Sequence, residues 1–583
     1  MRYREATGVN VEAVGVRYLG QSFNELLYDY SPASYKPRVM GIEGLCDEAL
    51  QLVAQIDSQL IDRARIDSVL EEIEHVVKTD PVAKNLIDFE VNYYTSFPKD
   101  SDLLDLKVRL GLLWNKVSNG KYIQALQNKI IEVCSDDRQK KVIYQAARRW
   151  ISALNFSGYS VQFIRDRVDA IFHASETQIF SEKDLVHFFQ SFSFEPEKFD
   201  VVFLASAMIR EVSDVARKFG AEVISEGHSL FESLVSAGLE CKHGDAFVYF
   251  SEINSYDHFS ARASTERSLE HISDLFVLFH HKTKILWYPG ALVRKVDSAW
   301  KLIVPPNPSV KRVKDNIPNK AAKKLNAVFN NLSFTDNESV GRFISVVRLH
   351  GSALESVSAE ARLVNIWTAL EVLVHRESDS KLKAVIRLLT PFLIHGYIDS
   401  LLYALAGDLY RWNRKQFYEI LKIDELKGWK IHHRLAAVLL GGVYESRRSD
   451  LYENISSYAL LCNRCFSISQ LISSGTSLDD ALKEHERRVI WQIRRIFRSR
   501  NLIVHDGSTP QYLDALTENA HEYLDAFIGR FLALCTRSMS ATTLEEAVVF
   551  QAKLYDQWRK EVSSCQNVSL DSVKKVCALD ALA

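Results

Sequence analysis

The sequence lacks both an apolar run long enough to cross a membrane and the cysteine framework of a secreted domain. Its 583 residues include eight cysteines, which are scattered without the spacing of a disulfide scaffold and therefore favour a reducing compartment. The first residues are charged rather than apolar, and no stretch approaches the roughly 18 apolar residues of a transmembrane helix. These absences predict a soluble, cytoplasmic protein without membrane contact.

Motifs that bind nucleotides or metals are also missing. Neither a Gly-x-x-x-x-Gly-Lys-Ser/Thr loop nor a Gly-x-Gly-x-x-Gly turn after a strand occurs. The close pair Cys462 and Cys465 has no second pair at ligand spacing, and its apolar helical setting favours two buried thiols. The histidine doublets at 280–281 and 432–433 would point to opposite faces of a strand and form no ligand pattern. We therefore expect neither a cofactor nor a metal.

What is present is ample material for packed cores. Hydrophobic residues make up 47% of the chain, and the length suits about three domains. Helical periodicity dominates from Gly41 to about Gln190, with breaks at Pro81, Pro98 and Gly120.

A different pattern follows this helical region. Short branched and aromatic segments predict strands at 198–205, 245–250, 285–288 and 300–304. Prolines at 305, 306 and 308, followed by a basic stretch at 311–314, predict a linker into a second helical region. The expected fold is mainly α, with a small central α+β segment. The expected organisation is a helical accessory region at 1–190, a mixed α/β segment at 191–310, a helical domain at 318–540 and a C-terminal helical extension at 541–583.

The richest chemistry lies in the run Arg500-Asn501-Leu502-Ile503-Val504-His505. A guanidinium binds phosphate oxygens bidentately, and an imidazole that titrates near neutral pH can move the proton of a ribose 2'-hydroxyl. The run follows an amphipathic helix predicted at 486–497 and precedes the helix-ending segment 506–510. On an ideal helix, positions 500 and 505 stand about 140° apart, so the pair converges only if the helix is distorted or a second surface, such as a dimer mate, completes the site.

Arg500, Asn501 and His505 match the motif of the HEPN superfamily of helical ribonuclease domains, and the sequence most resembles its ApeA-like branch. The segment 363–373 supports the resemblance, since it is similar to the first long helix of that branch, with Trp367 and then a Leu-Glu pair. The resemblance covers about 200 residues and implies a helical bundle that dimerises and cuts RNA, either tRNA or mRNA, without metal. In the implied roles His505 is the general base or acid and Arg500 holds the scissile phosphate. Asn501 orients one of these two side chains, and Glu371 faces the motif arginine, Arg500. The implied products carry 2',3'-cyclic phosphate ends.

Members of this branch are largely bacterial proteins linked to phage defence. The resemblance therefore implies an effector of abortive infection or of a toxin–antitoxin system. Because a free ribonuclease is toxic to its host, we expect residues 1–310 to help restrain or trigger it by binding a phage-derived trigger, a nucleotide signal or a neutralising partner such as an antitoxin. The alternatives are a non-catalytic HEPN dimerisation scaffold, in which Arg500 and Glu371 form a buried ion pair and His505 caps a helix, and an RNA-binding regulator.

Charge favours an RNA site only locally. The chain has 72 basic and 74 acidic residues, a balance that excludes a general nucleic-acid coating protein. Basic residues nevertheless gather near the motif, at Lys483, Arg487, Arg488, Arg494, Arg495, Arg498 and Arg500. We expect Arg494, Arg495 and Arg498 to bind RNA. The alternative is an arginine-rich helix face exposed to solvent.

Overall fold

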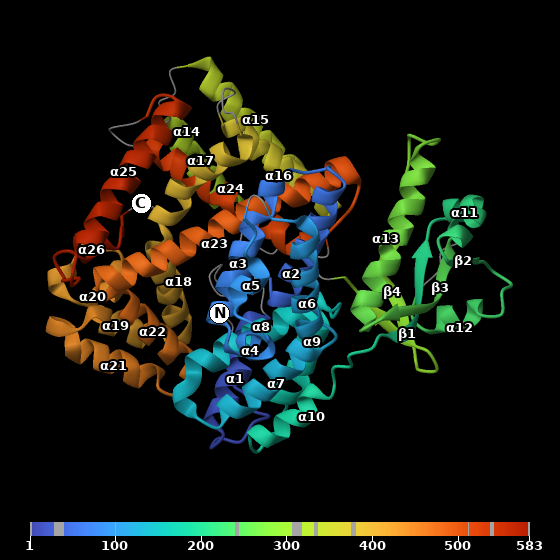
Figure 1. Cartoon of the computed structure of the whole chain (residues 1–583), viewed down its shortest axis with the longest axis horizontal. Helices are drawn as coiled ribbons and strands as arrows, with labels where there is room; N and C mark the ends of the chain where they lie inside the picture. The colour runs from blue at the N-terminus through green and yellow to red at the C-terminus, as the bar shows by residue number, and fades with distance from the viewer. Residues whose placement is uncertain are drawn as a thin grey trace.

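Helices dominate the computed structural model of the chain (Figure 1). The structure describes residues 3–27, 40–98, 101–239, 244–305, 317–331, 336–374, 380–510, 512–536 and 541–580. It is 69% helical with 7% strand, which confirms the mainly α fold class. The linker expected after residue 305 falls on 306–316, outside the described residues.

The first helical region begins with α1 and ends with α10. Its helices are α1 (Val14–Leu26), α2 (Ile42–Asp57), α3 (Asp67–Thr79), α4 (Pro81–Leu86), α5 (Val91–Thr95), α6 (Leu103–Val117), α7 (Lys121–Cys134), α8 (Lys140–Phe156), α9 (Val161–Phe172) and α10 (Leu185–Phe189). Pro81 is the first residue of α4, a position at which the backbone N–H has no acceptor within the helix, so the missing N–H of proline costs no hydrogen bond. The Asp80 side chain accepts hydrogen bonds from the backbone amides of Val82 and Ala83. Gly120 precedes α7 with a φ of 75°, which suits glycine. The predicted helices and breaks are confirmed.

A five-stranded sheet follows, in the order β2-β3-β1-β4-β5 with every neighbouring pair antiparallel. Its elements are β1 (Glu197–Ala205), α11 (Ser213–Lys218), β2 (Ala221–Ile224), α12 (Phe231–Ser236), β3 (Ala246–Ser255), α13 (His258–Val277), β4 (Trp287–Lys295) and β5 (Lys301–Ile303). The four predicted strands are confirmed, although β4 begins two residues later than expected. The four-residue β2 was missed because its pattern is too short to stand out.

The central strand of this sheet is buried on both faces, so it reads as an unbroken apolar run. Phe203 belongs to the same buried cluster as Leu269 of α13, while Val202, which points to the other face, belongs to the same cluster as Phe231 of α12. The sheet thus has two cores of its own. In Figure 1 it stands at one end of the molecule, beside the helical regions.

In its described residues the second helical region contains long helices of 13 to 27 residues and shorter ones of 4 to 11 residues. Its helices are α14 (Pro318–Asn330), α15 (Asn337–Glu355), α16 (Ala359–Leu373), α17 (Lys381–His395), α18 (Tyr397–Trp412), α19 (Arg414–Ile420), α20 (Ile431–Leu440), α21 (Glu445–Ile455), α22 (Ala459–Ile472), α23 (Gly475–Asn501), α24 (Leu513–Cys535), α25 (Leu544–Ser564) and α26 (Val573–Val576). The helices predicted at 363–373, 462–465 and 486–497 are α16, α22 and α23. Within the described residues no single helix has both the length and the apolar composition to cross a membrane, and one bent pair, α17 with α18, meets both criteria only when taken together.

The two helical regions share one hydrophobic core, which extends from α1 through α26. At their junction the Gln21 side chain accepts a hydrogen bond from the Leu460 amide at 3.1 Å. The buried Arg464 contacts Asp408 at 2.5 Å and also pairs with Glu25 of α1. The core is therefore continuous across the sheet insertion. The expected borders at 190 and 310 bracket the strands, and their exact positions stay a prediction.

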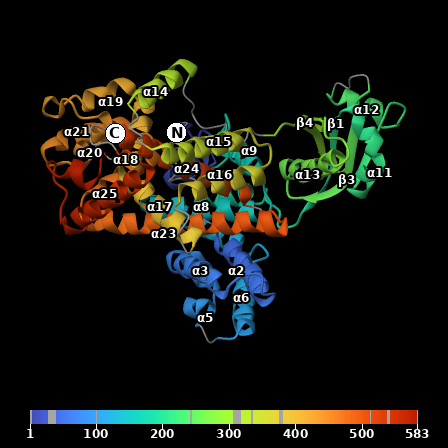
Figure 2. The ribbon, with the colours of Figure 1, turned by 90° about the horizontal axis from the view of Figure 1, so that it is seen from above.

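The long helix α23 organises this arrangement. Figure 2 shows α2, α3, α5 and α6 on one side of α23 and most other helices on the opposite side. The end of α23 thus lies where helices from the two ends of the chain meet.

Candidate active site at the end of helix α23

The 27-residue helix α23 carries the motif residues at its C-terminal end. The Ser474 side chain caps its start by accepting a hydrogen bond from the Ser477 amide at 3.1 Å. Val489, Ile493 and Ile496 lie at helical spacing and are buried, as their pattern predicts. One packed face therefore holds the helix up to the motif.

The motif ends in a distorted helical turn. Residues Leu502–Asp506 form a π-helix, and Gly507 closes it with a φ of 62° and an amide that donates to the Leu502 carbonyl. A π turn is wider than an α turn, so it reduces the angle between positions 500 and 505. The helix is therefore distorted at the motif, and the His505 side chain is exposed to solvent.

Arg500 faces α16. Its Nη2 atom lies 3.9 Å from the Glu371 carboxylate, which confirms the expectation that Glu371 faces the motif arginine. Its Nη1 atom donates to Oδ1 of Asn501 at 3.1 Å. Its Nε atom is buried and has no hydrogen-bond partner among the described residues. This unpaired donor lies inside the protein rather than on the surface of the cleft.

Asn501 and His505 line a cleft of about 660 Å³ between α2, the turn after it and the end of α23. The cleft is lined by Glu48, Gln51, Leu52, Gln55, Ile56, Gln59, Leu60, Ile61, Asp62, Arg63, Arg65, Phe497, Arg498, Asn501, Leu502, His505, Asp506 and Tyr512. Arg500 is not among these residues. A single chain thus brings Asn501 and His505 into one cleft and leaves Arg500 on the side of α16.

Two arginines that the sequence analysis did not select carry the positive charge of the cleft. Arg63 donates to the Ser101 carbonyl at 2.9 Å and stacks 3.7 Å from the centre of the Phe97 ring. Arg65 lies 5.1 Å from the centre of the Phe497 ring. Neither arginine has an ion pair within the described residues, and carbonyls and rings leave a guanidinium charged. The nearby Asp62 and Asp506 offset part of this charge.

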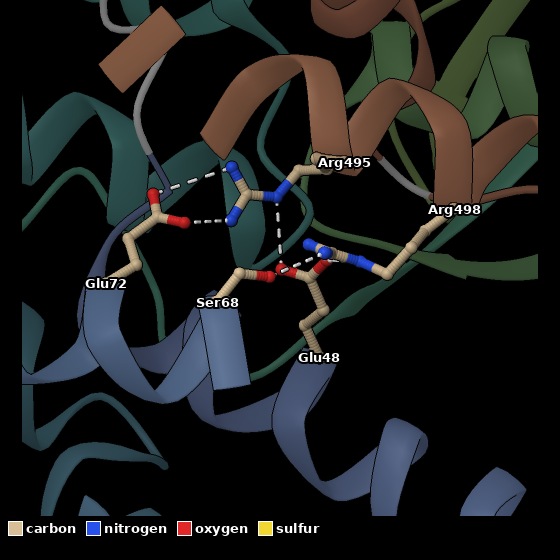
Figure 3. Close-up of polar contacts among 5 residues, drawn as sticks. All are labelled: Glu48, Ser68, Glu72, Arg495 and Arg498. Atoms are coloured by element: carbon tan, nitrogen blue, oxygen red, sulfur yellow. Dashed lines mark hydrogen bonds and ion pairs between the residues drawn. The ribbon is translucent and has the colours of Figure 1, made fainter. Parts of the chain in front are cut away.

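Arg495 and Arg498 are held by acids of α2 and α3 (Figure 3). Arg495 is 1% exposed, with Nε 3.0 Å from Glu48 and Nη2 2.5 Å from Glu72. Arg498 contacts Glu48 at 2.6 Å and donates to the Ser68 hydroxyl at 3.2 Å. Burial opposes the charge of Arg495, yet both carboxylates raise its pKa. Burial likewise opposes ionisation of Glu48, but its two arginine partners lower its pKa.

This network corrects the expectation that Arg495 binds RNA, because a fully buried and neutralised guanidinium is not available to a phosphate. Arg498 keeps 12% of its side chain exposed and is committed to Glu48. Arg494 is partly exposed and has no ion pair in the described part of the chain, so its predicted RNA contact stays a prediction. Nothing near residue 495 in the sequence signals the network, since its acids are more than 400 residues away.

The histidine doublet at 432–433 also differs from expectation. It lies on α20 rather than on a strand, and its two Nε2 atoms are 2.9 and 3.4 Å from Oδ1 of Asp399. Successive helical residues stand about 100° apart, so both buried rings reach one carboxylate. The Nε2 atom of His433 also lies 2.6 Å from the Leu579 carbonyl.

In comparisons with known proteins, no family model, curated protein or solved structure matches the chain. The resemblance to HEPN domains therefore depends on the motif and its setting at the end of α23.

Proposed function

We propose that this chain is a metal-independent endoribonuclease of the HEPN type. The observation that carries the proposal is the exposed His505 in a cleft that it shares with Asn501, Arg63 and Arg65. An imidazole beside guanidinium groups that form no direct ion pair within the described residues suits acid–base chemistry on a phosphodiester.

RNA supplies its own nucleophile for this reaction. His505 takes the proton of the 2'-hydroxyl while solvent protonates the leaving 5'-oxygen, or it protonates the 5'-oxygen while solvent takes the 2'-hydroxyl proton; in both cases the 2'-oxygen bonds to phosphorus as the P–O5' bond breaks. Asn501 orients the phosphate or the imidazole, and arginines balance the charge that develops on the phosphoryl oxygens. The products carry a 2',3'-cyclic phosphate and a 5'-hydroxyl.

Arg500 enters this scheme through a second copy of the chain. Its guanidinium lies on the α16 side, outside the cleft of its own chain, so a homodimer that pairs two α23 ends supplies the missing phosphate ligand. In biological terms we propose a cytoplasmic effector of bacterial defence or of a toxin–antitoxin pair, which a partner or trigger controls.

The test is cleavage of total RNA and of tRNA by the purified full-length protein in EDTA, with product ends mapped. We expect His505→Ala and Arg500→Ala each to lower the rate about 100-fold or more. The exposed His187, far from the cleft in the sequence and located on α10, supplies the control His187→Ala, which should cut like wild type. Cleavage that survives both motif substitutions would contradict the assignment.

One observation favours the alternative of a non-catalytic scaffold or RNA-binding regulator. Arg500 is occupied by Glu371 and Asn501 rather than turned into the cleft. RNA binding with strong salt dependence and intact product would identify a regulator. A dimer that neither binds nor cuts RNA would identify a scaffold.

A further inference from the structure

Three potential metal ligands converge between helices α15 and α24, away from the motif. Nε2 of His350 lies 3.0 Å from Nε2 of His521 and 3.0 Å from Oδ1 of Asp525. Nδ1 of His521 lies 3.4 Å from Oδ2 of Asp525. All three residues can direct one ligand atom each into a space less than 5 Å wide.

Hydrogen bonds alone satisfy the polar atoms of this cluster poorly. The Nε2 atoms of His350 and His521 face each other, and His350 Nε2 also faces the Asp525 carboxylate. If His350 Nε2 carries the hydrogen, this one N–H has two acceptors at the same distance, His521 Nε2 and Asp525 Oδ1. Protonating both rings would place two cations in contact.

The donor set and spacing suit a zinc-type ion. Imidazole nitrogens and a carboxylate oxygen bind Zn²⁺ at about 2.0–2.2 Å, which places the ligand atoms of a tetrahedron about 3.3 Å apart. Nε2 of His350 lies 3.0 Å from a ligand atom of each of the other two residues, and one ligand atom from each of the three lies within 4.8 Å of the others, so a small closing movement would bring them to that spacing. His521 and Asp525 stand one helical turn apart on α24, so they face the same side, and His350 approaches from the neighbouring α15.

The cluster is closed on one side and open on the other. The side chain of His521 is 6% exposed, whereas that of Asp525 is 45% exposed. Three protein ligands with solvent on the fourth side are the arrangement in which zinc keeps a water molecule.

The buried group of Asp399, His432 and His433 is a weaker candidate. Nε2 of His433 lies 2.6 Å from the Leu579 carbonyl, which accepts only from a protonated nitrogen, so that atom is not available to a metal. Neither His350 nor His521 has such a carbonyl contact through its ring within the described residues.

We propose that His350, His521 and Asp525 form a divalent cation site of the zinc class that links α15 to α24. The site is independent of the proposed ribonuclease chemistry. The sequence analysis expected no metal because its ligands come from two segments 171 residues apart, with no motif spacing.

The test uses full-length protein, stripped with EDTA and dialysed, then titrated with Zn²⁺ by calorimetry and with Co²⁺ by visible absorption. We expect one equivalent of Zn²⁺ per chain, a tetrahedral Co²⁺ spectrum and a higher melting temperature with zinc. Asp525→Asn, an isosteric change at a half-exposed position, and His350→Ala should each weaken binding about tenfold or more. The exposed Asp556→Asn on α25 is the matched control and should bind as wild type does.

Equal affinity in wild type, Asp525→Asn and His350→Ala would overturn the proposal, as would the absence of zinc binding. Loss of zinc binding only in His432→Ala would show that the ion binds at Asp399, His432 and His433 instead, and would also overturn the proposal. A melting temperature of Asp525→Asn in EDTA equal to that of stripped wild type shows that the variant is folded. RNA cleavage in EDTA is a separate readout, so failure of the ribonuclease proposal leaves this test intact.

Discussion

Arg494 and Arg495 are neighbours on α23, yet the tertiary structure places them in opposite surroundings. Arg494 is partly exposed, while Arg495 is enclosed by Glu48 of α2 and Glu72 of α3. A buried charge without a partner is strongly unfavourable, so the two carboxylates are required once the helix packs in this way. One arginine is therefore structural and the other remains available at the surface.

Removing the buried cation should destabilise the protein. We expect Arg495→Met to lower the free energy of unfolding by about 3–5 kcal/mol, since it leaves Glu72 buried and unpaired. The double variant Arg495→Met/Glu72→Gln should recover part of this loss. Arg494→Met is the matched control and should stay within about 0.5 kcal/mol of wild type in urea unfolding. Equal destabilisation by the two single variants would contradict the structural role of Arg495.

The buried His395 makes the free energy of unfolding depend on pH. Its Nδ1 atom faces Nη2 of Arg530 at 2.7 Å and Nε2 of Gln551 at 3.1 Å, so it must act as an acceptor. Burial, and then Arg530, lower its pKa from 6.5 to about 3. Because the folded pKa lies below the unfolded one, the unfolded chain takes up the proton first, and stability falls as the pH drops below about 6.5.

The variant His395→Asn keeps an acceptor and removes the titration. Between pH 6.5 and pH 5 it should lose about 2 kcal/mol less stability than wild type, as measured from urea midpoints at each pH. His187→Asn changes an exposed histidine and should follow the wild-type pH curve. A wild-type pH dependence that persists in His395→Asn would show that this ring does not titrate as described.

At the scale of an element, the end of α23 decides where the motif points. The π turn of Leu502–Asp506 carries His505, which is exposed in the cleft that Asn501 also lines, whereas Arg500 stays on the side of α16. Gly507 closes this turn in the left-handed region. π turns often occur at functional sites, and this one is closed by a residue type that suits its backbone.

Gly507→Ala tests the closing residue. No atom lies within 4 Å of a Cβ added at Gly507, so the penalty of about 1 kcal/mol comes from the backbone alone. Gly529, inside α24, is equally open but helical, and Gly529→Ala should stabilise the protein by about 0.5–1 kcal/mol. Urea midpoints of the two variants should therefore move in opposite directions. A shared direction would be inconsistent with the positive φ at Gly507.

At the scale of the whole molecule, helices from the two ends of the chain build one core, and the sheet between them has its own. The cleft combines both ends as well, because α2 forms one wall and the end of α23 the other. Any trigger that moves α2 and α3 relative to α23 would reshape the cleft and strain the Arg495 network at the same time.

This division predicts how fragments behave. Residues 195–305, expressed alone, should unfold cooperatively on heating when followed by circular dichroism, since both of their cores lie within the fragment. Residues 318–583 alone should be aggregated or molten, because they expose the face that α1 and α3 cover in the full chain. A stable, monomeric 318–583 fragment would refute the shared core.

Much of the candidate site follows from local sequence. The spacing of Val489, Ile493 and Ile496 predicts α23, the residues after His505 predict its end, and the motif chemistry selects Arg500, Asn501 and His505. The pairing of Arg500 with Glu371 follows from the family resemblance rather than from spacing. Arg63 and Arg65 were missed, because a short basic pair carries no signal until a cleft forms beside it.

The sequence by itself determined most of the elements and the motif residues, since backbone hydrogen bonding and side-chain periodicity act over a few residues. Only the tertiary structure decided which charges are buried and which ligands meet. Arg495 pairs with acids 447 and 423 residues away, and His350 meets His521 across 171 residues. Such contacts depend on how whole helices pack, because desolvation penalises any charge that packing encloses without a partner.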